Sequence, residues 1–130
     1  MKNLVAIILL LFFVVNTARA QQKNFGIEPT ASCKIIAPNA FTPNNDGVND
    51  LFYVSLTGGC NLVTFEMKIF DRWGRLVFEA NEITETWDGT YDGRQLKEGV
   101  YLWQVSATWV QDASSAKTTE AKNGSLVLIR

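Results

Sequence analysis

Apolar and polar residues alternate along two long stretches of the chain. The apolar positions of one face are Phe65, Met67 and Ile69 in residues 63–71, and Tyr101, Trp103, Val105 and Ala107 in residues 99–109. A period of two is that of a β-strand, because successive side chains of a strand point to opposite faces of the sheet. Both stretches are therefore predicted to be strands with a buried face.

Shorter strands are predicted between turn-forming residues. Their ranges are 34–37, 51–55, 75–79, 117–122 and 125–129. Arg72-Trp73-Gly74 ends in glycine and fits a three-residue hairpin turn whose last residue is left-handed. Asn123-Gly124 is interpreted as a bulge within one long strand, and a two-residue hairpin turn is the alternative.

The spacing of these strands, with Gly, Asn and Asp between them, predicts the fold class. We predict an all-β fold, an immunoglobulin-like antiparallel β-sandwich of about seven strands. A β-barrel is the alternative. Depending on which face each strand turns inward, the core is expected to hold Phe41, Phe52, Val54, Phe65, Met67, Ile69, Val77, Trp87, Val100, Leu102, Leu126 and Leu128.

Residues 1–20 have the pattern of a secretory signal peptide. Lys2 precedes an apolar run over residues 4–15, and Ala18-Arg19-Ala20 fits a small-residue cleavage site. The run is shorter than the roughly 20 apolar residues of a transmembrane helix. We expect cleavage after residue 20, a short flexible lead over residues 21–32, one domain over residues 33–130, and no transmembrane segment in the mature chain.

The charge of the chain excludes several classes of partner. The whole chain has 12 basic and 13 acidic residues, a formal net charge of −1. Cleavage would remove Lys2 and Arg19, which leaves ten basic residues against thirteen acidic ones. A mildly acidic domain without a basic cluster in its sequence is not expected to bind nucleic acid or a lipid surface.

The two cysteines, Cys33 and Cys60, are predicted to form one disulfide, because an even pair in an exported chain is most simply bridged. Closing this loop stabilises the fold by roughly 3–4 kcal/mol in the chain-entropy model. A redox or metal-binding pair is the alternative. It is disfavoured because the chain has no C-x-x-C motif and no histidine.

The absence of histidine also limits catalysis. It excludes an imidazole base, a histidine metal ligand, and a Ser-His or Cys-His pair. Asp88, Asp92 and Glu98 are the acidic residues that could converge as catalytic carboxylates. However, Asp88-Gly89 and Asp92-Gly93 are typical of two consecutive turns. We therefore expect the chain not to be an enzyme.

Residues 44–50 hold three Asn, two Asp and one Gly, between Phe41 and Phe52. Asn and Asp side chains cap their own turns, and Gly accepts left-handed backbone, so an ordered loop with two apolar anchors is predicted. These oxygens also suggest a Ca²⁺ site as an alternative, with the ligands Asn44, Asp46, Asn49 and Asp50.

The EF-hand register does not fit this loop. It places Thr42 at the first ligand position and Tyr53 at the twelfth, and neither supplies the carboxylate that the motif needs. Turn formation is therefore the favoured role of the loop, and no cofactor is expected, with Ca²⁺ as the alternative.

Two of the four tryptophans are candidates for binding. Trp73 lies in the predicted hairpin turn and Trp109 lies near a strand end, and an exposed tryptophan can stack on a sugar ring or anchor a protein partner. The favoured interpretation of Trp73 is that it folds back onto its own sheet. Trp87 and Trp103 are expected in the core.

Four segments carry a resemblance to a known family. They are PNAFTPNNDGVNDLF at 38–52, FEMKIFDRWGRLVFE at 65–79, TWDGTYDGRQLKEGVYLWQV at 86–105 and GSLVLIR at 124–130. In this order they resemble the gliding-motility-associated C-terminal domain, the type B sorting domain of the type IX secretion system of Bacteroidetes. The resemblance implies an immunoglobulin-like domain that directs cargo through the outer membrane and performs no catalysis.

The resemblance also implies a partner and a location. The partner is the type IX translocon or an associated outer-membrane protein. The protein is expected to cross the inner membrane, pass through the periplasm, and be secreted or displayed on the cell surface. Only a short segment separates the predicted cleavage site from the matching region, so a sorting domain without a cargo domain is expected.

Recognition is expected to use exposed loops and the end of the chain. The candidate residues are Asn44, Asn45, Asp46, Asn49, Asp50, Arg72, Trp73, Asp88, Asp92 and Arg130. Addition of the terminal strand to a partner sheet is an alternative mode of recognition. The alternative function is a small secreted or cell-surface adhesive module that binds carbohydrate, such as a cell-surface glycan, through Trp73 and Trp109.

Overall fold

The structure, a computed structural model, describes residues 32–110 and 116–130. The predicted signal peptide and all but residue 32 of the predicted lead lie outside the described residues. In the part of the chain that the structure describes, no helix has the length and apolar character needed to cross a membrane.

The described residues form nine strands. They are β1 (Lys34–Ile36), β2 (Ala40–Phe41), β3 (Ser55–Thr57), β4 (Asn61–Phe70), β5 (Leu76–Ala80), β6 (Thr90–Tyr91), β7 (Arg94–Gln95), β8 (Gly99–Val110) and β9 (Lys117–Leu128). The long strands β4 and β8 agree with the alternating pattern. The two-residue strands β2, β6 and β7 were not predicted, because such short pairings leave no pattern in the sequence.

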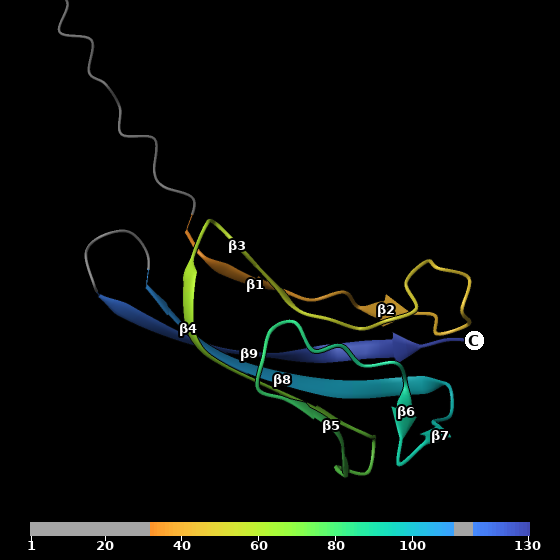
Figure 1. Cartoon of the computed structure of the whole chain (residues 1–130). Coiled ribbons are helices and arrows are strands. Elements are labelled where there is room, and N and C mark those ends of the chain that lie inside the picture. Colours follow the sequence, from red (N-terminus) through yellow and green to blue (C-terminus); the bar gives the residue numbers. More distant parts are fainter. Residues whose placement is uncertain (1–31, 111–115) are drawn as a thin grey trace, which may run out of the picture.

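Five strands form one sheet in the order β2-β9-β8-β4-β5, β1 pairs with β3, and β6 pairs with β7. Figure 1 shows β1 and β3 lying over one face of the five-stranded sheet. The two layers confirm the predicted β-sandwich, and the barrel alternative is wrong because the sheet stays open, with β2 and β5 at its margins. One pair departs from the antiparallel prediction, since β2 runs parallel to β9.

Strand β9 is one unbroken strand. Its antiparallel ladder with β8 runs from Gly99 opposite Leu128 to Val110 opposite Lys117 without a shift in register. The predicted single long strand over residues 117–128 is therefore confirmed, but neither a bulge nor a hairpin turn occurs at Asn123-Gly124. Gly124 lies opposite Trp103 instead, and an added Cβ at Gly124 would be 2.6 Å from Cζ2 of that indole.

The core lies between the two layers and contains ten of the twelve predicted residues. The two exceptions are Val100 and Leu102, whose side chains are 55% and 51% exposed. Strand β8 turns its other face inward, with Tyr101, Trp103, Val105, Ala107 and Trp109 buried. The opposite choice would have buried the polar side chains of Gln104, Ser106 and Thr108, which costs free energy unless each finds a partner.

The predicted strand over residues 51–55 is wrong. Only its last residue, Ser55, belongs to a strand, β3; before it a single bridge forms, in which the N–H and C=O of Phe52 both bond to Trp87, at 2.8 and 2.9 Å. The side chain of Phe52 is buried, while its neighbours Leu51 and Tyr53 are exposed. Phe52 thus anchors one end of the Asn-rich loop in the core, as Phe41 does the other end, and the two ring centroids lie 6.2 Å apart.

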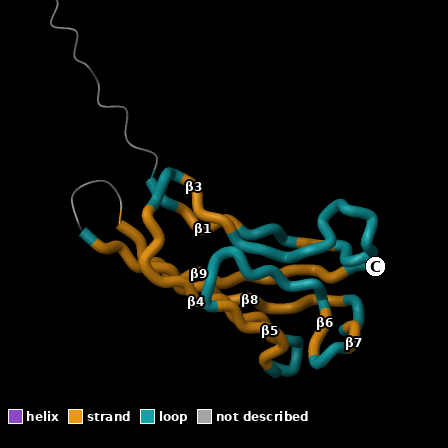
Figure 2. The backbone as a smooth tube through the Cα atoms, viewed as in Figure 1, coloured by secondary structure: helices purple, strands orange, loops and turns teal. Residues whose placement is uncertain are grey.

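The predicted disulfide is present and joins Cys33 to Cys60. Cys33 lies just before β1, and Cys60 lies just before β4. The bridge therefore ties the small β1–β3 sheet to the start of a strand of the large sheet. Figure 2 shows the opposite end of the molecule, where the loop after β2 lies beside the C terminus.

Candidate functional site

The loop of residues 44–50 is held by its own side chains. The carboxylate of Asp50 accepts the backbone N–H groups of Asn44 and Asn45 at Oδ1, at 3.0 and 2.7 Å, and that of Gly47 at Oδ2, at 2.8 Å. Burial raises the pKa of Asp50, but these N–H groups and that of Asp46 together lower the pKa by more, so that it lies below its ordinary value. A charged Asp50 therefore organises the loop.

Two further oxygens of the loop are engaged in the same way. Asn44 Oδ1 accepts the N–H of Asp46 at 3.0 Å, and Asp46 Oδ1 accepts the N–H of Val48 at 2.8 Å. Asn45 and Asn49 have left-handed backbone, with φ of 62° and 54°, which asparagine tolerates better than most residues. These contacts agree with the predicted turn-forming role of the loop.

The alternative of a Ca²⁺ site gains no support from this geometry. The described residues contain no group of three or more acidic or cysteine side chains placed to hold a metal ion. Oxygens of Asn44, Asp46 and Asp50 already accept backbone N–H groups. A Ca²⁺ ion needs about six to eight oxygen ligands, and the two carboxylates of this loop alone fall short of that number.

The turn between β4 and β5 is built on the buried carboxylate of Asp71. Asp71 Oδ1 accepts the N–H groups of Trp73 and Arg75, both at 2.9 Å, and Oδ2 accepts Nε of Arg75 at 3.0 Å. The backbone N–H of Arg75 is the main cause that lowers the pKa of Asp71; burial raises it, and the other bonds from Trp73 and Arg75 lower it again. This carboxylate is therefore ionised and fixes the turn.

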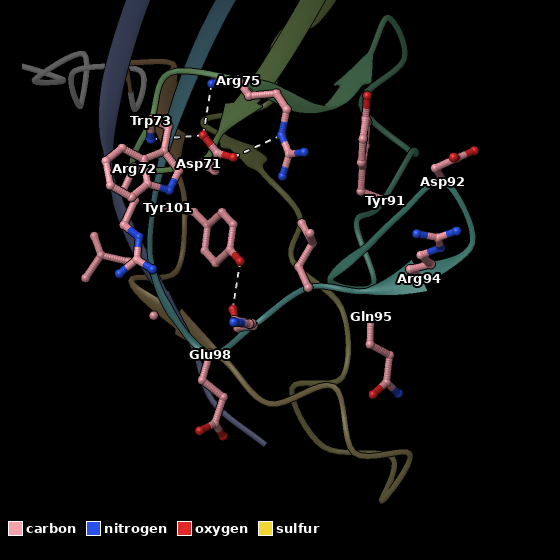
Figure 3. A pocket seen from close by; sticks show the side chains of 14 residues that line it. Asp71, Arg72, Trp73, Arg75, Tyr91, Asp92, Arg94, Gln95, Glu98 and Tyr101 are labelled. Carbon is pink, nitrogen blue, oxygen red and sulfur yellow. Dashed lines mark hydrogen bonds and ion pairs between the residues drawn. The ribbon is translucent and has the colours of Figure 1, made fainter.

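The same turn pushes Trp73 into solvent. Its side chain is 82% exposed, so the favoured interpretation, in which Trp73 folds back onto its own sheet, is wrong. The guanidinium of Arg72 lies over the indole, 5.4 Å from its centroid (Figure 3). Trp109, the other candidate for sugar stacking, is buried in the core and cannot contact a ligand.

The three carboxylates considered for catalysis have separate surroundings. Asp88 Oδ1 accepts the N–H and the hydroxyl of Thr90, at 2.9 and 2.7 Å, as a turn-forming Asp does. Asp92 lies at the left-handed tip of the β6–β7 hairpin, with φ of 52°. Glu98 accepts the backbone N–H of Arg130. In Figure 3 the carboxylates of Asp92 and Glu98 point away from one another.

Arg130 joins three segments at one end of the sandwich. Its guanidinium donates to the carbonyl oxygens of Leu96 and Gly89, at 2.5 and 3.2 Å, while its backbone N–H donates to Glu98. Packing here is close, because an added Cβ at Gly89 would lie 2.8 Å from Leu128 and 3.2 Å from Pro43. Arg130, the segment at Asp88 and Pro43, which precedes the Asn-rich loop, are thus brought together.

A groove of ≈ 490 Å³ lies between the β4–β5 turn and the segment from β6 to the start of β8. It brings together three predicted residues, Arg72, Trp73 and Asp92. It also contains Arg75, Tyr91, Arg94 and Lys97, which the sequence analysis missed. A signal was available: both hairpin turns carry an aromatic residue shortly before Gly-Arg, as Trp73-Gly74-Arg75 and as Tyr91-Asp92-Gly93-Arg94.

The floor of this groove includes Tyr101. Its hydroxyl donates to the carbonyl oxygen of Lys97 at 2.7 Å, which fixes the chain between β7 and β8. Burial of the hydroxyl raises the pKa of Tyr101, with a further contribution from Asp71. Tyr101 therefore remains a neutral hydrogen-bond donor that shapes the groove.

The ten predicted recognition side chains fall into two groups. Five hydrogen-bond to their own surroundings: Asn44, Asp46, Asp50, Asp88 and Arg130. The other five are exposed, and their side chains make no hydrogen bond to any residue that the structure describes: Asn45, Asn49, Arg72, Trp73 and Asp92. The first group shapes the surface, and the second group is free to contact a partner.

Comparison with known proteins gives the family of the chain. No curated protein matches it. Residues 35–128 match the model of the CHU_C type IX secretion signal domain, from within β1 to the end of β9. A type IX secretion signal directs export to the cell surface or into the medium, as the resemblance of the four segments implied. The chain belongs to the CHU_C type IX secretion signal domain family.

Proposed function

We propose that this chain is a non-enzymatic sorting domain, recognised by the type IX translocon or by an outer-membrane protein associated with it. Residues 1–20 direct the chain across the inner membrane, and the folded domain is recognised in the periplasm. The recognition surface is the end of the sandwich that holds the Asn-rich loop, the segment from Asp88 to Asp92, and Arg130. Membership in the family supports the sorting role.

The contacts of Arg130 carry this proposal. They connect Gly89, Leu96 and Glu98 to the end of β9, so that segments about 30 to 40 positions apart along the chain form one surface. A partner that contacts this surface reads the folded domain and not a short linear sequence. This distinguishes a folded chain from an unfolded one.

Recognition by strand addition to β9 is disfavoured near the C terminus. Strand β2 already occupies that edge, because Val127 N–H donates to Asn39 O at 2.9 Å and Ile129 N–H donates to Phe41 O at 3.1 Å. A partner strand would have to displace β2 and its buried Phe41. We therefore propose recognition through side chains and loop backbone.

A sorting assay tests the proposal. A reporter is placed between a signal peptide and residues 33–130 in a bacterium with a type IX system, and the reporter is measured in the periplasm, on the surface and in the medium. Deletion of residues 125–130 is unsuitable, because it removes Leu126 and Leu128 from the core. The informative variant is Arg130→Ala, and the control is Lys117→Ala, an exposed residue at the other end of β9.

The expected result is periplasmic retention with Arg130→Ala and normal export with Lys117→Ala. Thermal unfolding of both purified variants shows whether the domain still folds. A folded Arg130→Ala variant that is exported normally would contradict the proposed surface. Retention of both variants would mean that export responds to any change of charge.

One observation favours a second function, an adhesive module that binds carbohydrate. Trp73 is 82% exposed, and an exposed indole is a suitable surface for stacking on a sugar ring. A polysaccharide pull-down with the unmodified chain and with Trp73→Ala tests it. Binding that is lost in the variant supports the second function, and no binding by either chain retires it.

A further inference from the structure

Half of the residues that line the groove beside the β4–β5 turn carry a charge. Its lining contains four basic residues, which are Arg72, Arg75, Arg94 and Lys97, and three acidic ones, which are Asp71, Asp92 and Glu98. The whole chain has a net charge of −1. The groove therefore has an excess of one basic side chain, on a chain that is mildly acidic as a whole.

One acidic residue of the lining is neutralised by one basic residue. Asp71 Oδ2 accepts Nε of Arg75 at 3.0 Å, so these two charges cancel. Figure 3 shows the carboxylates of Asp92 and Glu98 pointing outward, and Glu98 accepts the backbone N–H of Arg130. Arg72, Arg94 and Lys97 are therefore the basic groups left to meet a ligand.

Two of the basic groups are oriented by aromatic rings. The guanidinium of Arg72 lies 5.4 Å from the centroid of Trp73, and that of Arg75 lies 5.2 Å from the centroid of Tyr91. A guanidinium stacked on a ring keeps the N–H donors in its own plane available for a carboxylate; for Arg75, that carboxylate is Asp71, which accepts from Nε. Each stack also restricts the arginine before any ligand binds, which reduces the entropy lost on binding.

The size and spacing of the groove favour a ligand with several negative charges. Its volume is ≈ 490 Å³, and its basic groups come from the β4–β5 turn, from β7 and from the segment before β8. A single small anion can contact only one of these places. A flat lipid surface cannot enter a hollow, whereas an extended peptide can follow it and also contact the exposed Val100 on its wall.

We propose that this groove binds an extended acidic segment of a partner protein, whose carboxylates pair with Arg72, Arg94 and Lys97. The inference rests on the proposed function in that this partner belongs to the type IX machinery. Trp73 lies at one wall and provides an apolar contact for the same segment.

The fluorescence of Trp73 provides a way to measure binding to the groove. The chain has four tryptophans, and Trp87, Trp103 and Trp109 are buried, so quenching of fluorescence by acrylamide reports mainly on Trp73. The purified chain is titrated with N-acetylated hexaglutamate amide, and with hexaglutamine as the uncharged control. We expect saturable protection of Trp73 by hexaglutamate only. This protection should be lost in 0.5 M salt, because the Debye length falls to roughly 4 Å at that ionic strength and exposed charge pairs are then largely screened.

Two matched variants locate the site. Arg94→Gln removes an exposed charge of the groove and is expected to weaken hexaglutamate binding about threefold, and the double change with Lys97→Gln about tenfold. Lys117→Gln removes the same charge at the far end of the β8–β9 ladder, where it pairs with Val110. It is expected to leave binding unchanged.

Three results would overturn the inference. They are equal binding of hexaglutamine, equal loss of binding in Lys117→Gln and Arg94→Gln, or binding to phosphatidylglycerol vesicles without binding to hexaglutamate. The sorting assay separates this inference from the proposed function. If Arg130→Ala blocks sorting but hexaglutamate does not bind, only the groove inference fails; if hexaglutamate binds but Arg130→Ala is sorted normally, only the proposed surface fails.

Discussion

The indole of Trp103 packs against Gly124, its direct partner across the β8–β9 ladder. A Cβ at position 124 would lie 2.6 Å from Cζ2 and 2.8 Å from Cε2 of the ring. Gly124 is therefore required by the space that the indole occupies, although it lies in the middle of a strand.

Gly124→Ala is expected to lower the free energy of unfolding by about 1–3 kcal/mol, because the indole must move within a packed core. In an open strand position, the same change stabilises by roughly 0.5–1 kcal/mol. The sign of the change in the free energy of unfolding, measured in urea, therefore shows whether position 124 is packed or open. Ser125→Ala, at the exposed neighbouring position, is the control and should change stability by less than about 0.5 kcal/mol.

The orientation of β8 and β9 is tested by two leucines. Leu126 is fully buried and Leu102 is half exposed, so Leu126→Ala should cost about 2–5 kcal/mol and Leu102→Ala less than about 1 kcal/mol. Denaturant unfolding of the two variants gives both values. Similar costs would mean that β8 does not turn Tyr101 and Trp103 inward.

The Cys33–Cys60 bridge closes a loop with a sequence separation of 27. Its loss in Cys33→Ser/Cys60→Ser is expected to lower stability by about 3–4 kcal/mol, mainly because the unfolded chain becomes less restricted. A reductant should destabilise the unmodified chain and leave the double variant unchanged. Two free thiols in the denatured, unreduced chain would show that the bridge does not form.

Asp71 makes stability depend on pH in the acidic range. The pKa of Asp71 in the folded chain is lowered by its hydrogen bonds to Arg75 and Trp73. In the unfolded chain, its pKa is the ordinary value of about 3.9. The unfolded state therefore binds the proton first, so the contribution of Asp71 is complete above about pH 4 and is lost as the pH falls through the folded pKa.

Asp71→Asn should flatten this acidic limb of the stability curve and lower stability at neutral pH. Urea unfolding between about pH 2.5 and pH 7 measures both the slope of the acidic limb and the stability at neutral pH. Asp92→Asn removes the same charge from an exposed turn and serves as the control. An acidic limb that is equally steep in Asp71→Asn and in the unmodified chain would contradict the role given to Asp71.

The sequence alone predicts those features of the fold that depend on local pattern. The alternation around Met67 predicts β4, and the pair Cys33 and Cys60 predicts the bridge, since few alternatives exist for two cysteines. The first residues of β8 leave its inward face open, because Val100 and Leu102 are as apolar as their neighbours. The polar side chains of Gln104, Ser106 and Thr108, further along the same face, are the local signal for it, and in the structure Tyr101 of the other face pairs with the buried Leu126.

The candidate site shows the same division. The turn-forming role of Asp50 and Asp88 follows from their neighbours in sequence. The exposure of Trp73 does not, because it depends on how the buried Asp71 holds the turn. The groove depends on contact between Arg75 and Tyr91, which lie on different hairpins and which no local pattern connects.

The place of β9 in the sheet has a consequence for protein synthesis. β9 lies between β2 and β8, and it supplies Leu126 and Leu128 to the core. The ribosome makes residues 117–128 after every other described strand, so the domain cannot complete its fold until those residues have been added. A product released early by a stalled ribosome or a truncated message lacks the folded signal. Under the proposed function, in which the folded domain is what the partner recognises, export is restricted to chains whose translation has passed β9.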